Sequence, residues 1–404
     1  MKVSIIGQGY VGQNLAVSAA SVGHNVIGLD LDTNLINDLK NGISFVPGIN
    51  KNLLLKLIDQ DLYTPTNDFS LLAETSIIII AVPTPINENR QPDLSSILMA
   101  CKSINKVVTK PTLVISESTS FPGTLRNIIK ETVEMGNKTS FLFAASPERV
   151  DPGNNEWKIE NTPRLISGLT EPATKLAIEF YGSFCEKIVK VASPEVAEAA
   201  KLLENTFRQV NIALINEFSE IMNKLNITAN EVVNAASSKP FGFMKFLPSV
   251  GVGGHCIPVD PEYLTYFAKS LDIDPKLINT ANLLNVNRPI QVVNRIRHFL
   301  GQELFGLKIQ IAGISYKTGI SDMRESPVIE LISILREAGA NVKWHDPVVG
   351  NWREERSAPL DSDIDLGLIV APHSEIDFSV WKNSDSTVLD LSVGSKDLGW
   401  PKFL

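Results

Sequence analysis

The chain contains little that would build a disulfide framework, a metal centre or a membrane span. Its 404 residues include only three cysteines, Cys101, Cys185 and Cys256, which are widely spaced and odd in number. This pattern predicts neither disulfides nor a zinc site, and it indicates a reducing compartment. The longest apolar run, residues 77–82, is too short to cross a bilayer. Because the first residues show no signal-peptide pattern, we expect a cytoplasmic protein with no membrane insertion. Because the cysteines do not have the spacing of metal ligands, we also expect no bound metal.

Positive charge is also scarce. The chain has 37 lysines and arginines against 45 aspartates and glutamates, a net charge of −8 at pH 7. This balance argues against nucleic acid or an anionic membrane surface as the main partner. Any anionic ligand must then be held by local basic groups or helix N-termini. The composition, with 44% hydrophobic and 20% charged residues, is that of an ordinary globular protein, and the length allows two or three domains.

A dinucleotide-binding fingerprint opens the chain. Residues 2–6 read as a buried strand, residues 7–12 have the pattern GxGxxG, a helix is expected through residue 20, and a second strand over residues 25–30 ends in Asp30. Here the glycines allow a tight turn and close approach to a pyrophosphate, while Asp30 can bind the adenosine ribose. A carboxylate at this position disfavours a 2′-phosphate, which predicts NAD rather than NADP. The predicted cofactor contacts are Gly7, Gly9, Tyr10, Val11, Gly12 and Asp30.

Three further apolar runs predict parallel strands of the same sheet, and each run ends at polar residues. Ligands of open α/β sheets bind beyond the carboxyl ends of the strands, so these polar residues are expected to face one crevice. As an alternative, Thr84, Ser118 and Thr119 cap the helices that follow, and both readings can hold together. The runs are residues 76–82, 113–116 and 141–145, and the polar residues after them are Thr84, Thr119 and Glu148.

The middle of the chain predicts a long helix. Ser193 and Pro194 indicate its start, and the pattern continues to about residue 224 without a breaker. Lys201 and Asn205 are four residues apart, so they share a face of this helix. Apolar neighbours flank them, and polar groups on a partly buried face need partners or a function. Without further evidence, a lysine in such a pattern is more often a surface residue whose aliphatic stem is buried.

Cys256 lies in a loop over residues 251–261 that contains three glycines. Glycine allows the backbone to turn sharply and to approach a ligand closely, and a thiol at such a bend can act as a nucleophile when it loses its proton. As an alternative, Cys256 is a small buried hydrophobic residue. Helices are expected on both sides of the loop. They cover residues 227–236 and 261–270, and a third runs from residue 275 through Pro289 toward residue 298.

The last hundred residues predict a second, smaller α/β domain. Strands are expected over residues 306–313, 341–347, 366–370 and 388–391, and a helix capped by Ser326 runs to about residue 338. The first turn lacks the full dinucleotide fingerprint, but Lys317 and Arg324 lie near the strand end and suit a phosphate group. A nucleotide diphosphate is therefore the expected ligand. As an alternative, Lys317 and Arg324 are surface cations that contact only solvent.

The predicted fold class is α/β, with two Rossmann-like doubly wound domains joined by a long central helix and a helical dimerisation region. We expect an NAD-binding domain over residues 1–190. A central helical domain with the cysteine loop and a dimer interface is expected over residues 191–300. A C-terminal domain for the substrate nucleotide is expected over residues 301–404.

With these motifs in this order, the chain resembles the UDP-glucose/GDP-mannose dehydrogenase family over nearly its whole length. The family oxidises the C6 alcohol of a nucleotide sugar to a carboxylate with two NAD⁺, for surface polysaccharide biosynthesis, and its long helix mediates dimerisation. The resemblance therefore implies a homodimer or higher homo-oligomer with a UDP-sugar substrate. The motifs that carry it are residues 7–12 with Asp30, residues 82–85, residues 146–149, residues 201–207, the loop 251–261, and Tyr316-Lys317 with residues 324–327.

The resemblance implies a covalent mechanism. Cys256, as thiolate, attacks the aldehyde formed by the first oxidation, and the second oxidation turns the resulting thiohemiacetal into a thioester. Lys201 stabilises the alkoxide and oxyanions, and as a nearby cation it would lower the pKa of the thiol. Asn205 holds the same oxyanion or water, and Asp260 orients Lys201.

The same resemblance assigns the remaining site residues. Glu148 would be a general base for the water that hydrolyses the thioester, and Thr119 would position that water. Lys317 would contact the substrate, and Arg324 would lie near the cofactor. The implied substrate contacts are Glu148, Arg149, Lys201, Asn205, Gly253 and Lys317, and the further cofactor contacts are Thr84, Thr119 and Arg324.

Within the family, the chain looks most like the UDP-N-acetylhexosamine branch, and UDP-N-acetylglucosamine is the favoured substrate. UDP-glucose, UDP-N-acetylmannosamine and UDP-N-acetylgalactosamine stay open as alternatives with the same chemistry. Two other classes are a catalytically silent NAD-binding protein and a two-electron alcohol dehydrogenase with a structural Cys256. The marks of the branch are Glu117-Ser118-Thr119 with Phe121-Pro122-Gly123, Asp151-Pro152-Gly153-Asn154, and residues 239–243.

Overall fold

The computed structural model describes residues 1–150, 154, 156–394 and 397–404. Asp151, Pro152 and Gly153, three of the residues that mark the UDP-N-acetylhexosamine branch, lie outside the described residues. The chain forms two compact units, and each is described by itself. The first comprises Met1–Glu204 and Glu262–Leu271, and the second comprises Asn205–Pro261 and Asp272–Leu404. The finer division at residues 190 and 300 stays a prediction.

The first unit is built on an eight-stranded sheet with the order β3-β2-β1-β4-β5-β6-β7-β8. All neighbouring strands are parallel except β6 and β7, which are antiparallel. The first six strands have the order of a dinucleotide-binding sheet, with the point of reversal between β1 and β4. The strands are β1 (Lys2–Ile6), β2 (Asn25–Leu29), β3 (Tyr63–Thr66), β4 (Ile77–Ile80), β5 (Thr112–Ser116), β6 (Phe141–Ala145), β7 (Arg164–Gly168) and β8 (Ile188–Lys190).

Helices cover both faces of this sheet, and successive residues of each strand point alternately into two separate cores. Ile77 and Ile79 of β4 pack with α1, α3 and α6, whereas Ile78 and Ile80 pack with α4, η2 and α5. Burial on both faces explains why β4 reads as a continuous apolar run. The helices are α1 (Tyr10–Ser21), α2 (Thr33–Lys40), α3 (Lys51–Asp59), η1 (Phe69–Glu74), α4 (Ser95–Val107), η2 (Leu125–Ile129), α5 (Lys130–Glu134) and α6 (Glu171–Tyr181).

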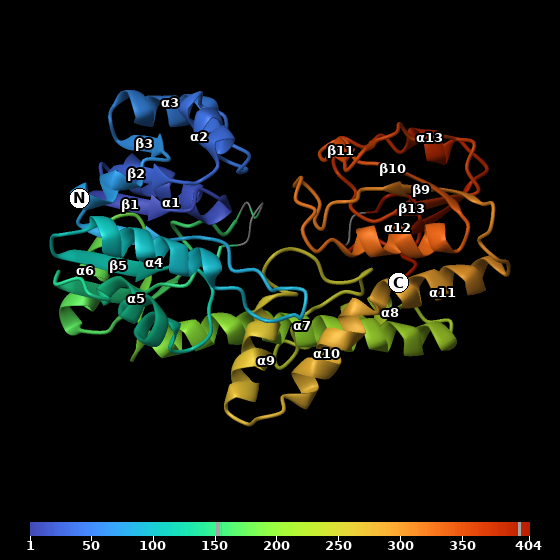
Figure 1. Ribbon diagram of the computed structural model, residues 1–404. Helices are drawn as coiled ribbons and strands as arrows, with labels where there is room; N and C mark the ends of the chain where they lie inside the picture. The colour runs from blue at the N-terminus through green and yellow to red at the C-terminus, as the bar shows by residue number, and fades with distance from the viewer. Residues whose placement is uncertain (151–153, 155, 395–396) are drawn as a thin grey trace. The chain divides into compact units, whose positions relative to one another are not determined.

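The central part of the chain is helical. The longest helix, α7 (Pro194–Lys224), is continuous and is seen in green in Figure 1. Its N-terminal third belongs to the first unit and its remainder to the second. The other helices of this part are α8 (Ala229–Ala236), α9 (Asp260–Ser270), α10 (Lys276–Val286) and α11 (Arg288–Leu300).

One predicted helix is interrupted. The helix expected from residue 275 through Pro289 is instead two helices, α10 and α11, separated by Asn287. Proline has no N–H to donate to the carbonyl four residues earlier, and its ring collides with that carbonyl. Pro289 therefore lies in the first turn of a new helix, where its missing N–H removes no hydrogen bond.

The second sheet has four parallel strands in the order β10-β9-β13-β14. Ile311 and Leu368 pack on one side with α12, and Ala312 and Ile369 pack on the other with α13, so both faces are covered. Figure 1 shows α12 and α13 on opposite sides of these strands. The elements are β9 (Lys308–Ala312), α12 (Pro327–Glu337), β10 (Asn341–His345), β13 (Leu366–Ile369), α13 (Ser379–Lys382) and β14 (Thr387–Asp390), with a small hairpin of β11 (Asn351–Trp352) and β12 (Glu355–Arg356).

The predicted α/β class, with Rossmann-like sheets and a long central helix, is confirmed. The predicted cap of α12 differs in detail, because the Ser326 hydroxyl donates to the Ile314 carbonyl, 2.8 Å away, and makes no capping hydrogen bond. Among the residues described, no helix combines the length and apolar character that crossing a bilayer requires.

Candidate active site

The turn between β1 and α1 has the close packing that its glycines predict. Gly7 has φ +95°, and a Cβ atom there would lie 2.4 Å from the Ala81 carbonyl oxygen. A Cβ atom at Gly12 would lie 1.8 Å from the Gly7 carbonyl oxygen, so only glycine fits at either position. By contrast, a Cβ atom at Gly9 would meet no atom within 4 Å. The middle glycine thus borders open space at the N-terminus of α1, where a pyrophosphate would bind.

Asp30 lies directly after β2 and is fixed by backbone groups. Its carboxylate accepts hydrogen bonds from the Gln8 N–H at 2.7 Å and the Asp32 N–H at 3.0 Å. Asp32 accepts hydrogen bonds from the first turn of α2, which it caps. Asp30 borders a cavity of about 340 Å³ beyond the ends of β1, β2 and β4. The lining includes residues that the fingerprint does not identify, among them Leu31, Phe69, Met99, Ala100 and Ser103.

Thr84, Thr119 and Glu148 follow β4, β5 and β6, which are neighbours in the sheet. The next helices begin only at Ser95 and Leu125, so Thr84 and Thr119 do not cap them. Ser118 donates instead to the Val82 carbonyl oxygen at 2.8 Å. The two threonines are therefore available for a role at the carboxyl edge of the sheet.

Glu148 and Lys201 form a buried ion pair within the first unit. The Lys201 Nζ lies 3.9 Å from Glu148 Oε2, and the two residues are 6% and 9% exposed. Burial raises the pKa of Glu148, while the charge of Lys201 and the backbone N–H of Val150 oppose that rise. A carboxyl group with a raised pKa beside a lysine is a common arrangement for proton transfer.

Arg149 is held by the helix that carries Lys201. Its guanidinium makes two hydrogen bonds to the Glu204 carboxylate of α7, at 2.7 and 3.1 Å, and a third to the Pro163 carbonyl oxygen at 2.7 Å. Bidentate pairing of this kind fixes the guanidinium plane. Arg149 therefore ties the segment after β6 to α7.

Sequence reasoning missed Glu198, which lies one turn before Lys201 on α7. Its carboxylate is 3% exposed and accepts hydrogen bonds from the Gly123 and Leu125 N–H groups, at 2.7 and 2.9 Å. These donors lie in the segment after Thr119 and at the first residue of η2. Burial raises the pKa of Glu198 to about 7, although the two backbone donors oppose the rise. Glu198 thus links the segment after Thr119 to the helix that carries Lys201.

Glu117 belongs to a second buried network. Its Oε1 accepts hydrogen bonds from Arg164 at 2.6 Å and from the Tyr181 hydroxyl at 2.5 Å. Arg164 also lies over the Tyr181 ring, 4.5 Å from its centroid. Glu117 therefore holds the end of β5 against β7 and α6, which gives this residue of the branch motif a structural role.

The second unit places Asn205 beside Asp260. The Asn205 side-chain amide donates to Asp260 Oδ2 at 2.5 Å, and both residues are buried, at 7% and 2% exposed. The Asp260 N–H donates to the Cys256 carbonyl oxygen at 2.8 Å, which fixes the chain between the cysteine and α9. Three of the predicted catalytic residues, Asn205, Cys256 and Asp260, are thus connected through two hydrogen bonds.

The three cysteines differ in exposure. Cys101 and Cys185 are buried, whereas Cys256 is exposed. Burial raises the pKa of Cys101 to about 12 and also raises the pKa of Cys185, so both remain neutral thiols. The neighbouring His255 has a lowered pKa, mainly through burial and also through the charge of Arg324. Cys256 is thus the one exposed cysteine of the three.

The cysteine loop packs against the segment that carries Lys317. A Cβ atom at Gly253 would lie 2.6 Å from the Tyr316 Cβ, and the Gly254 N–H donates to the Arg324 carbonyl oxygen at 3.0 Å. The Arg324 guanidinium pairs with Asp322, with a shortest contact of 2.5 Å. Within the second unit, the structure therefore brings Gly253, Lys317 and Arg324 to adjoining loops.

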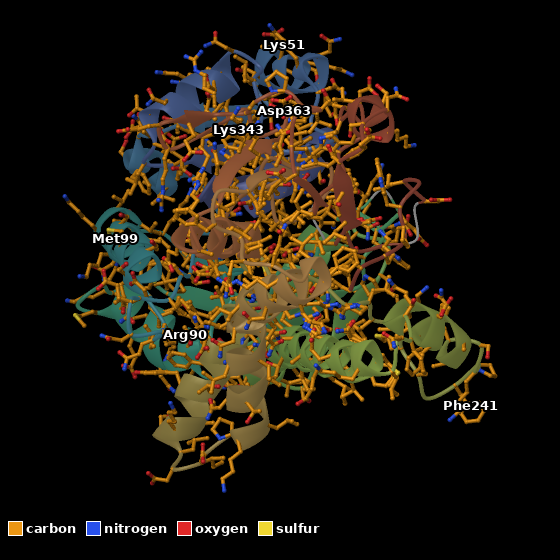
Figure 2. The ribbon with its side chains drawn as sticks, turned by 90° about the vertical axis from the view of Figure 1, so that its right-hand side faces the viewer. Lys51, Arg90, Met99, Phe241, Lys343 and Asp363 are labelled. Atoms are coloured by element: carbon orange, nitrogen blue, oxygen red, sulfur yellow. The ribbon has the colours of Figure 1, made fainter. Side chains whose placement is uncertain are left out.

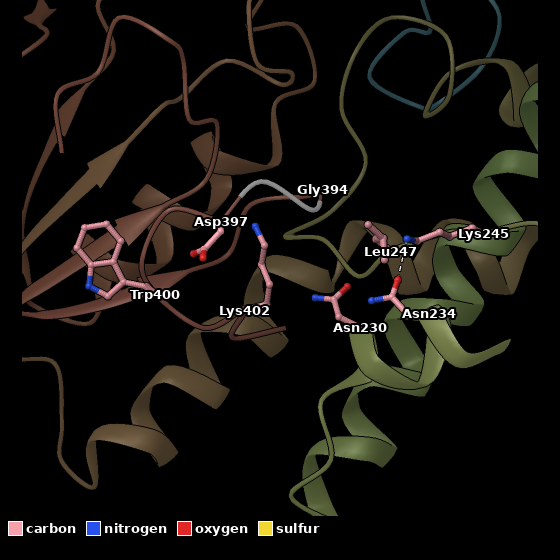
Figure 3. A pocket seen from close by; sticks show the side chains of 8 residues that line it. All are labelled: Asn230, Asn234, Lys245, Leu247, Gly394, Asp397, Trp400 and Lys402. Atoms are coloured by element: carbon pink, nitrogen blue, oxygen red, sulfur yellow. Dashed lines mark hydrogen bonds between the residues drawn. The ribbon is translucent and has the colours of Figure 1, made fainter. Parts of the chain in front are cut away.

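A further cavity of about 260 Å³ lies in the second unit, and none of the predicted site residues lines it. Figure 3 shows Asn230 and Asn234 of α8 on one side and Trp400 and Lys402 on the other. The Lys402 ammonium pairs with Asp390 at 2.9 Å, and that of Lys245 donates to Asn234 at 2.8 Å.

The 239–243 segment, another mark of the branch, lies just after α8. Figure 2 shows Phe241 projecting outward from it, and Phe241 is 70% exposed. The Lys239 ammonium lies 4.8 Å from the centroid of the Phe241 ring.

Three family models match the chain in order. They are described as the NAD binding domain (residues 1–185), the central domain (residues 195–287) and the UDP binding domain (residues 310–391) of the UDP-glucose/GDP-mannose dehydrogenase family. The NAD-binding assignment agrees with the glycine turn and Asp30. The third match contains Lys317 and Arg324.

Similar proteins cover most of the chain. A UDP-N-acetyl-D-glucosamine 6-dehydrogenase of Pseudomonas aeruginosa is 34% identical over 86% of this chain and 83% of its own. A UDP-N-acetyl-D-mannosamine dehydrogenase of Campylobacter jejuni is 35% identical over 84% of each chain. The solved UDP-D-ManNAc dehydrogenase of Pyrococcus horikoshii superposes with a TM-score of 0.87 and 28% identity, over 99% of this chain and 98% of that one.

These matches agree with the site on both cofactor and substrate class. The relatives are named for different sugars at nearly equal identity, so they leave the sugar open. The glycine turn and Asp30 fit NAD, and the UDP binding domain fits a nucleotide-sugar substrate. The chain belongs to the UDP-glucose/GDP-mannose dehydrogenase family and is an NAD-dependent nucleotide-sugar dehydrogenase.

Proposed function

We propose that the protein carries out both oxidations of a UDP-sugar, from the C6 alcohol through the aldehyde to the UDP-uronic acid. The observation that carries this proposal is Cys256, the exposed thiol in a chain whose other two cysteines are buried. A covalent intermediate retains a reactive aldehyde between the two oxidations. A two-electron alcohol dehydrogenase has no need of such a thiol.

The proposed roles follow the chemistry of each group. When bound, NAD⁺ accepts the hydride that leaves C6 in each oxidation. The Cys256 thiolate adds to the aldehyde carbon to form a thiohemiacetal, whose oxidation gives a thioester. Water then attacks the thioester, which yields the carboxylate and returns the thiolate.

Charged and polar groups stabilise these steps in the proposal. Lys201 and Asn205 stabilise negative charge on the C6 oxygen, and Asp260 orients the Asn205 amide through its 2.5 Å hydrogen bond. Glu148, whose pKa is raised by burial, takes the proton of the hydrolytic water, and Thr119 positions that water. Arg149 fixes the segment that carries Glu148, while Gly253 and Lys317 contact the UDP-sugar.

The cofactor contacts are proposed in two groups. Gly7, Gly9, Tyr10, Val11 and Gly12 hold the pyrophosphate, and Asp30 binds the adenosine ribose. Thr84 and Thr119 lie at the carboxyl edge of the same sheet. We assign Arg324 to the cofactor as well, with its guanidinium oriented by Asp322.

We favour UDP-N-acetylglucosamine as the sugar, with UDP-N-acetylmannosamine and UDP-glucose as alternatives. The branch motifs of the sequence, and a relative named for this sugar, support the choice. A uronic acid of this kind would serve surface polysaccharide biosynthesis. The buried thiols of Cys101 and Cys185 fit a reducing compartment such as the cytoplasm.

The sugar is tested by comparing kcat/KM for the three UDP-sugars with NAD⁺. We expect UDP-N-acetylglucosamine to be preferred by at least about tenfold, because UDP-glucose has no acetamido group to pair with the site and UDP-N-acetylmannosamine presents its acetamido group in the opposite orientation at C2. A preference for UDP-N-acetylmannosamine or UDP-glucose would overturn the sugar and leave the reaction. No turnover with any of the three, nor with UDP-N-acetylgalactosamine, would overturn the proposed function.

We also propose that a second copy of the chain covers α7. Four large apolar residues form a row along this helix at intervals of four and seven, and they are 45–64% exposed. Such spacing presents one continuous stripe, the pattern of a helix that packs against another helix. The residues are Leu203, Phe207, Leu214 and Ile221.

A further inference from the structure

A buried polar cluster lies at the carboxyl end of the second sheet. Ser315 follows β9, Asp346 follows β10 and His373 follows β13, and these three residues are 0–1% exposed. Their strands are neighbours in the order β10-β9-β13, which brings three distant parts of the sequence together. Fully buried polar groups persist when each has partners, so the contacts of this cluster show what it holds.

The hydrogen bonds fix the tautomer of His373. The Gly319 N–H donates to His373 Nδ1 at 3.0 Å, so Nδ1 carries no proton and Nε2 does. The Nε2–H group lies 3.1 Å from Asp346 Oδ2 and 3.1 Å from Ser315 Oγ. The Ser315 hydroxyl in turn donates to the Lys317 carbonyl oxygen at 3.0 Å.

Asp346 is the anchor of this cluster. It accepts hydrogen bonds from four backbone N–H groups, those of Ile314 and Ser315 at one oxygen and those of Val348 and Val349 at the other. Burial alone would raise the pKa of Asp346, but His373 and these donors outweigh it and hold the pKa below its ordinary value. Asp346 is therefore a carboxylate, matched to the neutral His373.

A serine, a histidine and an aspartate together resemble a hydrolytic triad, but the geometry excludes that role. In a triad the carboxylate and the hydroxyl contact opposite nitrogens of the ring. Here Asp346 and Ser315 both approach Nε2, and the Ser315 hydroxyl is buried and donates to a carbonyl. The cluster is therefore built to hold backbone in place.

The backbone that it holds is the turn of residues 315–319. Ser315 bonds the Lys317 carbonyl, and His373 bonds the Gly319 N–H, so both ends of the turn are fixed around Lys317. Between them, Tyr316 packs against Gly253 and Gly254 of the cysteine loop. Any displacement of this turn would move Lys317.

We propose that His373 is a positioning residue for UDP binding, which acts by accepting the Gly319 N–H and thereby holding Lys317 in place. The inference rests on the proposed role of Lys317 toward the UDP-sugar. Asp346 keeps His373 in the required tautomer, and Ser315 couples the ring to Lys317 from the other side.

Two substitutions test the two nitrogen atoms of the imidazole one at a time. His373→Asn places an amide oxygen near the position of Nδ1, so it can still accept from Gly319 while it loses the donor to Asp346. His373→Gln reaches toward the position of Nε2, so it can still donate to Asp346 while Gly319 loses its acceptor. The matched control is His345→Asn, because His345 lies at the end of the adjacent strand β10 and its side chain contacts Ser357.

The measurement is calorimetric titration of the full chain with UDP and, separately, with NAD⁺. We expect His373→Gln to raise the Kd for UDP by about tenfold or more, and His373→Asn to raise it by about threefold or less, with the Kd for NAD⁺ unchanged in both. His345→Asn should bind both ligands like the wild type. An unchanged NAD⁺ affinity distinguishes misplacement of Lys317 from general destabilisation.

The other outcomes are also decisive. A wild-type chain that does not bind UDP would contradict the proposed function itself. A wild-type chain that binds UDP, with equal Kd values for His373→Gln and His373→Asn, would overturn the inference alone. If His373→Gln does not fold, Ser315→Ala takes its place, and an unchanged Kd for UDP in that variant would overturn the inference.

Discussion

At the scale of single residues, two glutamates one turn apart on α7 have opposite environments. Glu195 is paired with Arg126 at 2.7 Å, and this hydrogen bond lowers the pKa of Glu195 to about 2. Glu198 is buried against backbone N–H groups, and burial raises the pKa of Glu198 to about 7. The two residues should therefore affect stability over different ranges of pH.

Glu198 should make the folded state less stable as the pH rises from about 4.5 to about 7. The folded protein binds the proton of Glu198 more tightly than the unfolded chain does, so this stabilisation is complete below the unfolded pKa and is lost as the pH passes the folded pKa. The expected loss is on the order of 3 kcal/mol. Because glutamine does not titrate, Glu198→Gln should remove that much of the pH dependence, measured by urea unfolding at pH 5 and pH 8.

Glu195→Gln is the control on the same helix. The pKa of Glu195 is lowered, so its contribution is present above pH about 4.5 and is lost only as the pH falls toward about 2. Between pH 5 and pH 8 this variant should keep most of the wild-type pH dependence, because the charge of Glu195 is only a minor cause of the raised pKa of Glu198. Equal pH dependence in Glu198→Gln and the wild type would show that the Glu198 carboxyl group is not in the environment described.

The residues that sequence reasoning missed share one property. Glu198, Arg164 and His373 bind partners far along the chain, and many of these partners are backbone groups. Every residue except proline has a backbone N–H group, so the sequence does not show which of these groups lies near a given side chain. No spacing or motif therefore indicates such a contact. The GxGxxG turn was recognisable because its chemistry depends on neighbouring residues, whereas the role of Cys256 came from the family resemblance and stays a prediction.

At the scale of elements, sequence periodicity predicted α7 well. Its bounds, Pro194–Lys224, are those expected from the proline at its start and the absence of breakers. The interruption between α10 and α11 was missed, because the apolar pattern continues across Pro289 while its ring does not allow one helix. Pro289 is visible in the sequence, and its effect on the helix backbone outweighs the apolar periodicity.

The apolar row of α7 gives a prediction about assembly. Leu214→Glu with Ile221→Glu places two charges in a surface that we propose a second copy covers, and a buried unpaired charge is costly. We expect the wild type to have twice the chain mass in light scattering after gel filtration, and the double variant to have the mass of one chain. Met135→Glu, at an exposed apolar residue outside α7, should leave the mass unchanged.

A wild-type chain that is monomeric would refute this assembly. So would a double variant with the mass of the wild type. In either case the exposed row on α7 would need a partner other than a second copy.

At the scale of the whole molecule, three family domains follow one another along a single chain. The order of motifs in the sequence was sufficient to identify the family, the cofactor and the substrate class. The sugar was not identifiable in this way, because Glu117 and Phe241, two residues of the branch motifs, are a buried structural carboxylate and an exposed ring.

The most direct test of the account is the NADH yield from a limiting amount of the preferred UDP-sugar. Wild type should give two NADH per sugar, because Cys256 retains the aldehyde for the second oxidation. Cys256→Ala should lose that second NADH, and Cys101→Ala, which removes a buried thiol, should keep it. One NADH per sugar from the wild type, unchanged by Cys256→Ala, would contradict the covalent mechanism and leave a two-electron alcohol dehydrogenase.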